Sequence, residues 1–344
     1  MRPNPSLILF LLAAFSTTAA LYSINSSEDY QRTIADNVIV FPRLNAKPEA
    51  ANVLFIETGA LKLKFKQNAE SVWVAENKFK YPASSKLIQK VISQLADMRK
   101  IAVKTRMPSR FNQIGVEPYQ KADANSVFVK LQGADGEILA ESILGAQFKR
   151  NNIGVAEGTF IRHPKEQQAW LASGSIDIPN DLLSWLDTRI LNIEFNEIKK
   201  IKFWEKLGGT AVVVRSNDDR GFIYQNRDGI GYLDRKIAKN LFGSFTKLSF
   251  VDVWPRETSE KWQSILYFEV EVYSGSKIAG QLLRGGSRKI LQFSVDENTI
   301  KKITLRGLSD TIAYSELNNW TYVIPAWQAD KFLEGLKVIE GGLQ

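Results

Sequence analysis

The single histidine of the chain is the residue type best suited to acid–base or metal chemistry. It is His163, in the segment FIRHPKEQQAWL at 160–171. An imidazole can act as a general base, as a metal ligand or as the middle member of a serine-hydrolase triad. The chain has no cysteine, which excludes thiol nucleophiles, disulfides and cysteine-based zinc sites. Sites that need several histidines are excluded as well.

The setting of His163 favours a turn residue over a catalytic one. It stands before Pro164 and between two segments that alternate in polarity, which is the pattern of a hairpin turn. No Gly-x-Ser-x-Gly segment supplies an activated serine. We therefore predict no catalytic residue, no metal site and no cofactor, and a protein that is not an enzyme. An acid–base enzyme that uses aspartate or glutamate stays open, because strands bring distant carboxylates together.

Short alternating strands with few helices must position these residues. At 60–67, ALKLKFKQ alternates apolar residues with lysine, so Lys62, Lys64 and Lys66 share one face of a half-buried strand. That lysine stripe is either the solvated side of a sheet or a binding face. Apolar spacing predicts a long amphipathic helix over 84–100 and a short helix over 178–191.

The order of these elements recurs about 139–150 residues later in the chain. The hairpin at 160–179 aligns with 304–325, which pairs Arg162 with Arg306 and His163 with Gly307. Because glycine replaces the histidine, the alignment supports a turn role for His163. The arginine is present in both copies. We expect each arginine to hold an acidic residue or a carbonyl, or else to bind an anion.

The repeat predicts an α+β fold of two tandem modules, at residues 51–193 and 194–344. Each module is expected to be a mainly antiparallel β-sheet with one long and one short helix. Residues 26–50 are predicted to form a stalk. The chain of 344 residues is long enough for two domains. No linker rich in proline, glycine or serine separates the modules, so we expect them to pack closely.

Residues 1–25 are predicted to be a transmembrane helix that anchors the chain, or else a cleaved signal segment. The stretch from Ser6 to Ile24 has no charged residue, and its 19 residues would span ~28 Å as a helix. Arg2 should stay in the cytoplasm by the positive-inside rule, which places the bulk of the chain outside. The predicted location is a single-pass protein of a bacterial inner membrane, with a periplasmic body. The predicted anchor residues are Leu7, Ile8, Leu9, Phe10, Leu11, Leu12 and Phe15.

The charge balance is basic, with 45 lysines and arginines against 37 aspartates and glutamates, for a net charge of +8. An exported chain is not expected to bind nucleic acid. Anionic lipid headgroups, an anionic envelope polymer or an acidic protein fit this charge better. A solvated basic surface without a partner is the alternative. The sequence does not fix the oligomeric state.

Several segments carry a resemblance to a known family. They are Tyr-Pro-Ala-Ser at 81–84, Gln-Ile-Gly-Val-Glu-Pro at 113–118 and Trp-Leu-Asp-Thr-Arg-Ile-Leu-Asn-Ile at 185–193. Over about residues 50–330 the chain resembles the bacterial domain-of-unknown-function family numbered 4340. The resemblance implies a membrane-anchored protein with its bulk outside the cytoplasm, linked to ABC-2-type or gliding-motility-type transport systems. It implies no catalytic residues.

These observations together predict a non-enzymatic, membrane-anchored extracytoplasmic protein. We expect it to be an accessory or binding subunit of an ABC-type transport or envelope complex, with a permease or another envelope protein as partner. The chain has no Walker motif, so we do not expect it to be the ATPase itself. The alternative is a binding module for an anionic envelope polymer or lipid headgroup that works without a transporter.

Overall fold

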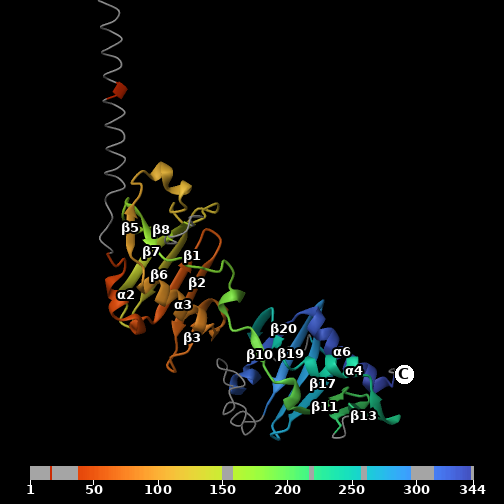
Figure 1. The fold of residues 1–344 in the computed structure, drawn as a ribbon. Coiled ribbons are helices and arrows are strands. Elements are labelled where there is room, and N and C mark those ends of the chain that lie inside the picture. The colour runs from red at the N-terminus through yellow and green to blue at the C-terminus, as the bar shows by residue number, and fades with distance from the viewer. Residues whose placement is uncertain are drawn as a thin grey trace, which may run out of the picture. The chain divides into compact units, whose positions relative to one another are not determined.

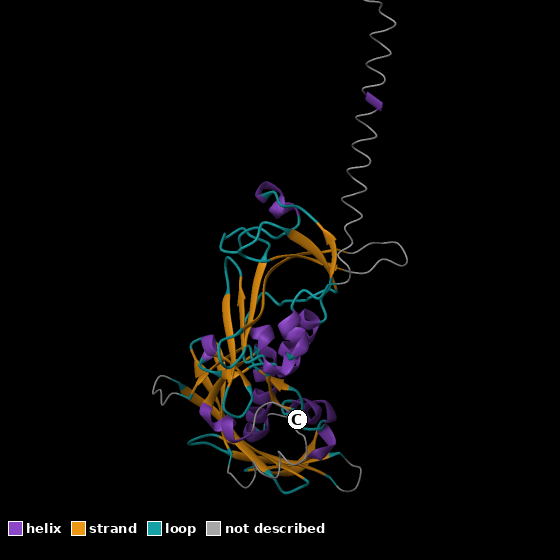
Figure 2. Ribbon diagram, turned by 90° about the vertical axis from the view of Figure 1, so that its left-hand side faces the viewer, coloured by secondary structure: helices purple, strands orange, loops and turns teal. Residues whose placement is uncertain are grey.

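The computed structural model describes residues 16–17, 38–148, 158–216, 221–256, 262–295 and 314–341 (Figure 1). The described residues form two compact units. Unit 1 takes them from Met1–Asn77 and Ser85–Asp181, and unit 2 takes them from Lys78–Ser84 and Leu182–Gln344. Strands predominate over helices in both units, as Figure 2 shows.

Unit 1 is built on an antiparallel sheet. Eight of its strands lie in the order β3-β2-β1-β6-β7-β8-β9-β5. Their bounds are β1 Val53–Glu57, β2 Lys62–Gln67, β3 Trp73–Ala75, β5 Lys100–Val103, β6 Val127–Gln132, β7 Ile138–Phe148, β8 Gly158–Arg162 and β9 Ala169–Ser173. Because side chains alternate between the faces of a strand, β1 and β2 each bury every second residue and leave the others half-buried or exposed.

The predicted amphipathic helix is present in unit 1 as α3 (Ser85–Ala96). Its apolar residues recur at three- and four-residue spacing and are buried, as an amphipathic helix requires. Short 3₁₀ turns complete the unit, at η1 Pro48–Ala50, η2 Glu76–Lys78 and η3 Pro108–Gln113. A cluster of buried apolar side chains joins the segment that follows β5 to the sheet. It comprises Phe111, Val116, Phe128, Ile143 and Ala169.

The folded part of unit 1 begins before residue 51, the start predicted from the sequence. Residues 42–46, placed in the predicted stalk, form the short helix α2 (Pro42–Ala46), and Leu44 is fully buried. The Asn45 side-chain amide donates a hydrogen bond to the Ala96 carbonyl, which ties α2 to the end of α3. The stalk prediction is therefore wrong for residues 38–50, because burial of Phe41 and Leu44 makes this segment part of the unit.

Unit 2 is built on a second antiparallel sheet, in the order β14-β13-β12-β11-β17-β18-β19-β20-β16. Its strands are β11 Ile198–Trp204, β12 Thr210–Arg215, β13 Phe222–Asn226, β14 Gly229–Leu233, β16 Asp252–Pro255, β17 Gln263–Val272, β18 Lys277–Gly285, β19 Arg288–Ser294 and β20 Trp320–Ile324. A small two-stranded sheet pairs β10 (Arg189–Leu191) with β15 (Leu248–Ser249).

Two helices accompany the sheet of unit 2. Helix α4 (Arg235–Gly243) begins after Asp234, whose carboxylate accepts hydrogen bonds from the N–H groups of Lys236 and Ile237. That is an N-cap, which satisfies backbone donors that the first helical turn leaves unpaired. Helix α6 (Ala326–Glu340) contacts α4 and is the last element in the order. The 3₁₀ turns are η4 Leu183–Trp185, η5 Phe195–Glu197 and η6 Tyr314–Asn319.

The two sheets have the same strand order, as the repeated sequence pattern predicts. Strands β3-β2-β1-β6-β7-β8-β9-β5 of unit 1 correspond one by one to β13-β12-β11-β17-β18-β19-β20-β16 of unit 2. Helices α3 and α4 also occupy the same place in the order of elements. The mixed α+β class and the mainly antiparallel pairing are confirmed.

Three details of the predicted repeat are wrong. In strand order β8 corresponds to β19 and β9 to β20, so Arg162, at the end of β8, does not correspond to Arg306 as the alignment of 160–179 with 304–325 predicted. The segment 178–191 is not a helix but the turn η4 followed by strand β10. The units change at Asp181–Leu182 rather than at 193–194. Leu191 is buried where β10 pairs with β15, and Trp185 is buried in η4, so neither segment forms one face of a helix.

The predicted anchor, Leu7–Phe15, lies outside the described residues. Ser16 and Thr17 are helical. Among the residues that the structure describes, no helix is long and apolar enough to cross a membrane.

Candidate functional site

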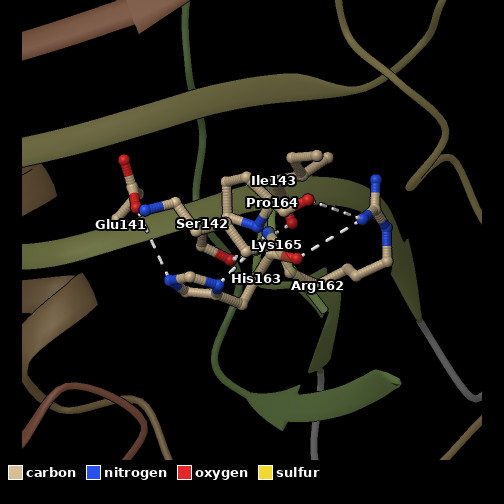
Figure 3. A network of polar contacts seen from close by, with 7 residues as sticks. All are labelled: Glu141, Ser142, Ile143, Arg162, His163, Pro164 and Lys165. Atoms are coloured by element: carbon tan, nitrogen blue, oxygen red, sulfur yellow. Dashed lines mark hydrogen bonds and ion pairs between the residues drawn. The ribbon is translucent and has the colours of Figure 1, made fainter. Parts of the chain in front are cut away.

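Arg162 ends strand β8 and holds the turn that follows it (Figure 3). Its Nη1 donates to the carbonyls of Glu166 at 2.9 Å, His163 at 3.3 Å and Pro164 at 3.4 Å. Its Nε donates to the Val116 carbonyl at 2.9 Å. One guanidinium therefore binds both the 163–166 turn and the segment after β5.

The environment of Arg162 is that of a structural cation. The residue is 6% exposed, and its guanidinium carbon lies 4.6 Å from the centre of the Phe111 ring. Burial lowers the pKa of Arg162, although the ordinary value of arginine is high enough to leave it charged. Within the described residues no carboxylate lies at salt-bridge distance from Arg162. Its partners are carbonyls, one of the two structural alternatives that the sequence left open.

His163 has both ring nitrogens engaged. Its Nε2 lies 3.5 Å from a carboxylate oxygen of Glu141, and its Nδ1 accepts a hydrogen bond from the Lys165 N–H at 3.3 Å (Figure 3). This pattern assigns the proton of the neutral ring to Nε2, because Nδ1 accepts. Either nitrogen must give up a contact before it can take a proton from a substrate or bind a metal.

Ser142 lies close to His163 but does not pair with it. The Ser142 hydroxyl is buried and lies 3.2 Å from the Ile143 carbonyl and 3.3 Å from the Arg162 carbonyl. A serine nucleophile needs a base within hydrogen-bond reach. Between these two described side chains there is no hydrogen bond, and the Ser142 hydroxyl is engaged by backbone carbonyls instead.

A pocket of about 400 Å³ lies beside His163 in unit 1. The Lys100 ammonium lies 4.3 Å from the centre of the Trp170 ring, so a cation already covers this aromatic wall. Charges of both signs surround the opening, which therefore favours neither an anion nor a cation. The charged and titratable lining residues are Arg43, Lys100, Glu141, His163 and Glu166.

One face of the unit 1 sheet gathers lysines around Phe55. On β1, Phe55 pairs with Lys64 of β2 on one side and with Lys130 of β6 on the other. Directly opposed residues point to the same side of a sheet, and Lys62 and Lys66 follow by alternation. The Lys64 and Lys130 ammoniums lie 5.7 Å and 4.4 Å from the centre of the Phe55 ring. We call Lys62, Lys64, Lys66, Lys130 and Phe55 the lysine face.

The corresponding strands of unit 2 pair their charges internally. The carboxylate of Glu271 on β17 lies 2.7 Å from the Lys200 ammonium and 2.9 Å from the Lys199 ammonium, both on β11. Glu269, also on β17, lies 3.4 Å from Lys277. Within the described residues none of the four lysines of the lysine face has such a partner. The two sheets therefore share a topology and differ in how their lysines are neutralised.

Glu271 should make the stability of unit 2 depend on pH. Hydrogen bonds from Lys200 and Lys199 lower its pKa from 4.5 to about 2. The stabilisation is therefore present above about pH 4.5 and is lost as the pH falls toward 2. The full shift corresponds to about 3 kcal/mol. Because both lysine side chains are partly exposed, at 47% and 31%, we expect about 1–2 kcal/mol.

Urea unfolding at pH 6 and pH 3 tests this expectation. The wild type should lose about 1–2 kcal/mol more than Glu271→Gln between the two pH values, because the amide does not titrate. An equal loss in both proteins would assign the pH dependence to other carboxylates.

The other sequence-predicted site residues are placed only in part. Arg306 and the anchor residues Leu7–Phe15 lie outside the described residues. Among the described residues no group of three or more histidines, aspartates or glutamates could hold a metal ion. Sequence reasoning missed Lys130 and Glu141, whose roles depend on cross-strand register. The alternating segment VFVKLQ at 127–132 was the available signal for Lys130.

Comparison with known proteins identifies the family. The family model "Domain of unknown function (DUF4340)" matches residues 73–263. The match covers more than half of the 344 residues, so the chain belongs to this family, as the sequence resemblance predicted. The matched range begins at β3 and ends at the start of β17, and is narrower than the expected 50–330. No curated protein matches the chain.

Proposed function

We propose that the protein is a non-enzymatic, membrane-anchored binding protein of the bacterial envelope. It would act as an accessory or binding subunit of an ABC-type transport or envelope complex, with a permease or another envelope protein as partner. The observation that carries the proposal is the repeated sheet. Two sheets of the same topology offer broad faces for binding. The side chains of Arg162 and His163, by contrast, are engaged in contacts that hold the 163–166 turn.

The engaged groups at the 163–166 turn support a binding role rather than catalysis. Arg162 donates to four carbonyls, and His163 has contacts at both nitrogens. A catalytic base must reach the proton that it abstracts, and a nucleophile must reach its base. Neither condition is met by Ser142 and His163 as they lie. Protein–protein recognition needs none of this chemistry and uses extended complementary surfaces.

The N-terminal sequence supports the proposed location. The uncharged run from Ser6 to Ile24 is long enough to span a bilayer as a helix. Arg2 precedes it, and positive charge is retained in the cytoplasm. We propose a single-pass inner-membrane protein whose two units lie in the periplasm. The periplasm is oxidising, and a chain without cysteine folds there without disulfides.

Membrane fractionation combined with protease treatment of spheroplasts tests the location. We expect the wild type in the membrane fraction, resistant to carbonate extraction and digested by external protease. Leu9→Arg/Leu11→Arg should abolish insertion, because each arginine costs ~2.5–3.5 kcal/mol at the centre of a membrane helix. A wild-type protein that is protected from protease or found in the cytosol would contradict the proposal.

The lysine face favours a second candidate function. A sheet face whose lysines have no carboxylate partner among the described residues is suited to an anionic envelope polymer or a lipid headgroup. In this alternative the protein binds that ligand without a transporter.

A further inference from the structure

We infer that the lysine face of unit 1 binds a linear polymer that carries regularly spaced anionic groups. The inference adds detail to the second candidate function. It rests on that function only for the statement that the ligand is anionic. It assigns the ligand to Lys62, Lys64, Lys66 and Lys130, and it selects a soluble polymer over a membrane surface.

The lysines form a row rather than a single cluster. Lys62, Lys64 and Lys66 are alternate residues of β2, so their Cα atoms are ~6.6–6.8 Å apart along the strand. Lys130 lies on β6, which is separated from β2 by β1 alone, at ~9.5 Å across the sheet. A row of cations with this spacing matches a chain of anionic groups better than it matches one small ion.

The lysines of this row form no ion pair within the described sheet. Glu57 is directly opposite Lys62, and Glu141 is directly opposite Lys130, but neither forms an ion pair with its opposite residue within the described structure. Glu141 contacts His163 instead. Two of the lysines, Lys62 and Lys66, are exposed, and a ligand can reach them without displacing a protein carboxylate.

Phe55 holds the two inner ammoniums in place. Lys64 and Lys130 approach its ring from the two neighbouring strands, at 5.7 Å and 4.4 Å from its centre. Such cation–π contacts restrict the long lysine side chains before a ligand arrives. Less conformational entropy is then lost on binding, which strengthens affinity for a polyanion.

The sheet of unit 2 is an internal control for this interpretation. Its β11 strand carries Lys200 and Lys202 in the same topological position as β1. Lys202 is directly opposite Glu269, and Lys200 is paired with Glu271. Lys200 of unit 2 thus forms an ion pair with a carboxylate, whereas no lysine of the lysine face forms one within the described residues.

A polymer fits the lysine face better than a bilayer does. Binding to a membrane surface is strengthened by apolar side chains that enter the acyl boundary, in addition to attraction between basic residues and anionic lipids. The two apolar side chains of β1 on this face, Val53 and Phe55, are half-buried, and two ammoniums cover the Phe55 ring. Contact with this face is therefore electrostatic.

Fluorescence anisotropy with labelled poly(glycerol phosphate) tests the inference, using the purified full-length protein in detergent at low and physiological salt. We expect binding that weakens with salt, because surface charge is screened over ~8–10 Å at physiological ionic strength. Lys64→Gln/Lys130→Gln should weaken binding at least about tenfold. The matched control, Lys199→Gln/Lys202→Gln, removes the same charge from unit 2 and should stay within about twofold of the wild type.

A second variant guards against misfolding. Lys62→Gln/Lys66→Gln changes only exposed side chains, and it should also weaken binding by about tenfold with an unchanged melting temperature. If the wild type binds the polymer but the unit 1 and control variants lose equal affinity, the lysine face is the wrong site while polymer binding stands. If the wild type binds anionic vesicles and not the polymer, the choice of ligand is wrong. If it binds neither at low salt, the second candidate function falls as well.

Discussion

Replacement of Tyr81 by alanine should lower the free energy of unfolding of unit 2 by about 3–5 kcal/mol, the usual cost of deleting a buried aromatic side chain. Tyr81 is fully buried. Its ring meets those of Phe250 and Trp320 edge to face, with centroids 5.2 Å and 4.9 Å apart. Its hydroxyl donates to the Asp187 carbonyl at 3.4 Å. The loss of the ring leaves a cavity among aromatic side chains.

The position of Tyr81 in the chain makes this result informative. The segment Lys78–Ser84 follows β3 and precedes α3, within the first repeat of the sequence, yet it belongs to unit 2. Lys78 forms an ion pair with Asp252 at 2.6 Å, and Ser84 donates its N–H to the Trp185 carbonyl at 2.7 Å. Tyr81, which lies between two unit 1 segments in the sequence, should therefore affect the stability of unit 2.

Hydrogen exchange read by mass spectrometry measures this effect for each unit. Tyr81→Ala should raise exchange in β15 and β20 and leave β6 and β7 of unit 1 nearly unchanged. Tyr81→Phe keeps the ring and should cost only about 0.5–1.5 kcal/mol for the lost hydrogen bond. Faster exchange confined to unit 1 would contradict the assignment of residues 78–84.

Replacement of Arg162 by alanine should destabilise unit 1 by at least about 3 kcal/mol. The change removes a charged donor to four carbonyls, and hydrogen bonds from charged groups contribute about 1.5–3 kcal/mol each. It also leaves the buried Val116 carbonyl without this donor. Arg162→Lys keeps the positive charge but should recover only part of the lost stability. An ammonium lacks the planar fork that reaches both segments. Urea unfolding of the variants measures these differences.

Arg43→Ala is the matched control for Arg162. Its side chain is 67% exposed and lies 3.3 Å from Glu137, and exposed pairs of this kind contribute ~0–1 kcal/mol. If Arg162→Ala instead kept full stability and lost affinity for anionic ligands, the arginine would be a ligand contact rather than a structural cation.

The sequence predicted those features that depend on local pattern. Alternation along 60–67 placed Lys62, Lys64 and Lys66 on one face, and apolar spacing located α3 within 84–100. The repeated order of elements predicted two sheets of like topology. Each of these features is encoded within a short window of residues.

Features set by long-range pairing were not predictable in this way. Lys130 joins the lysine face only because β6 is the neighbour of β1. Tyr81 packs in unit 2 because Phe250 and Trp320 lie there. The helical spacing of 178–191 was misleading, since pairing of β10 with β15 outweighs intrinsic preference in a segment this short. The alignment by sequence also paired Arg162 of β8 with Arg306, although β8 corresponds to β19.

The most direct test of the proposed function is affinity purification of the tagged full-length protein from detergent-solubilised membranes of its native host, with co-purifying proteins identified by mass spectrometry. As an accessory subunit of an ABC-type complex, the protein should recover a permease at near-stoichiometric yield. That yield should persist at high salt, because stable interfaces depend on buried apolar contacts more than on screened charge. Recovery of the protein alone at both low and high salt would contradict the account.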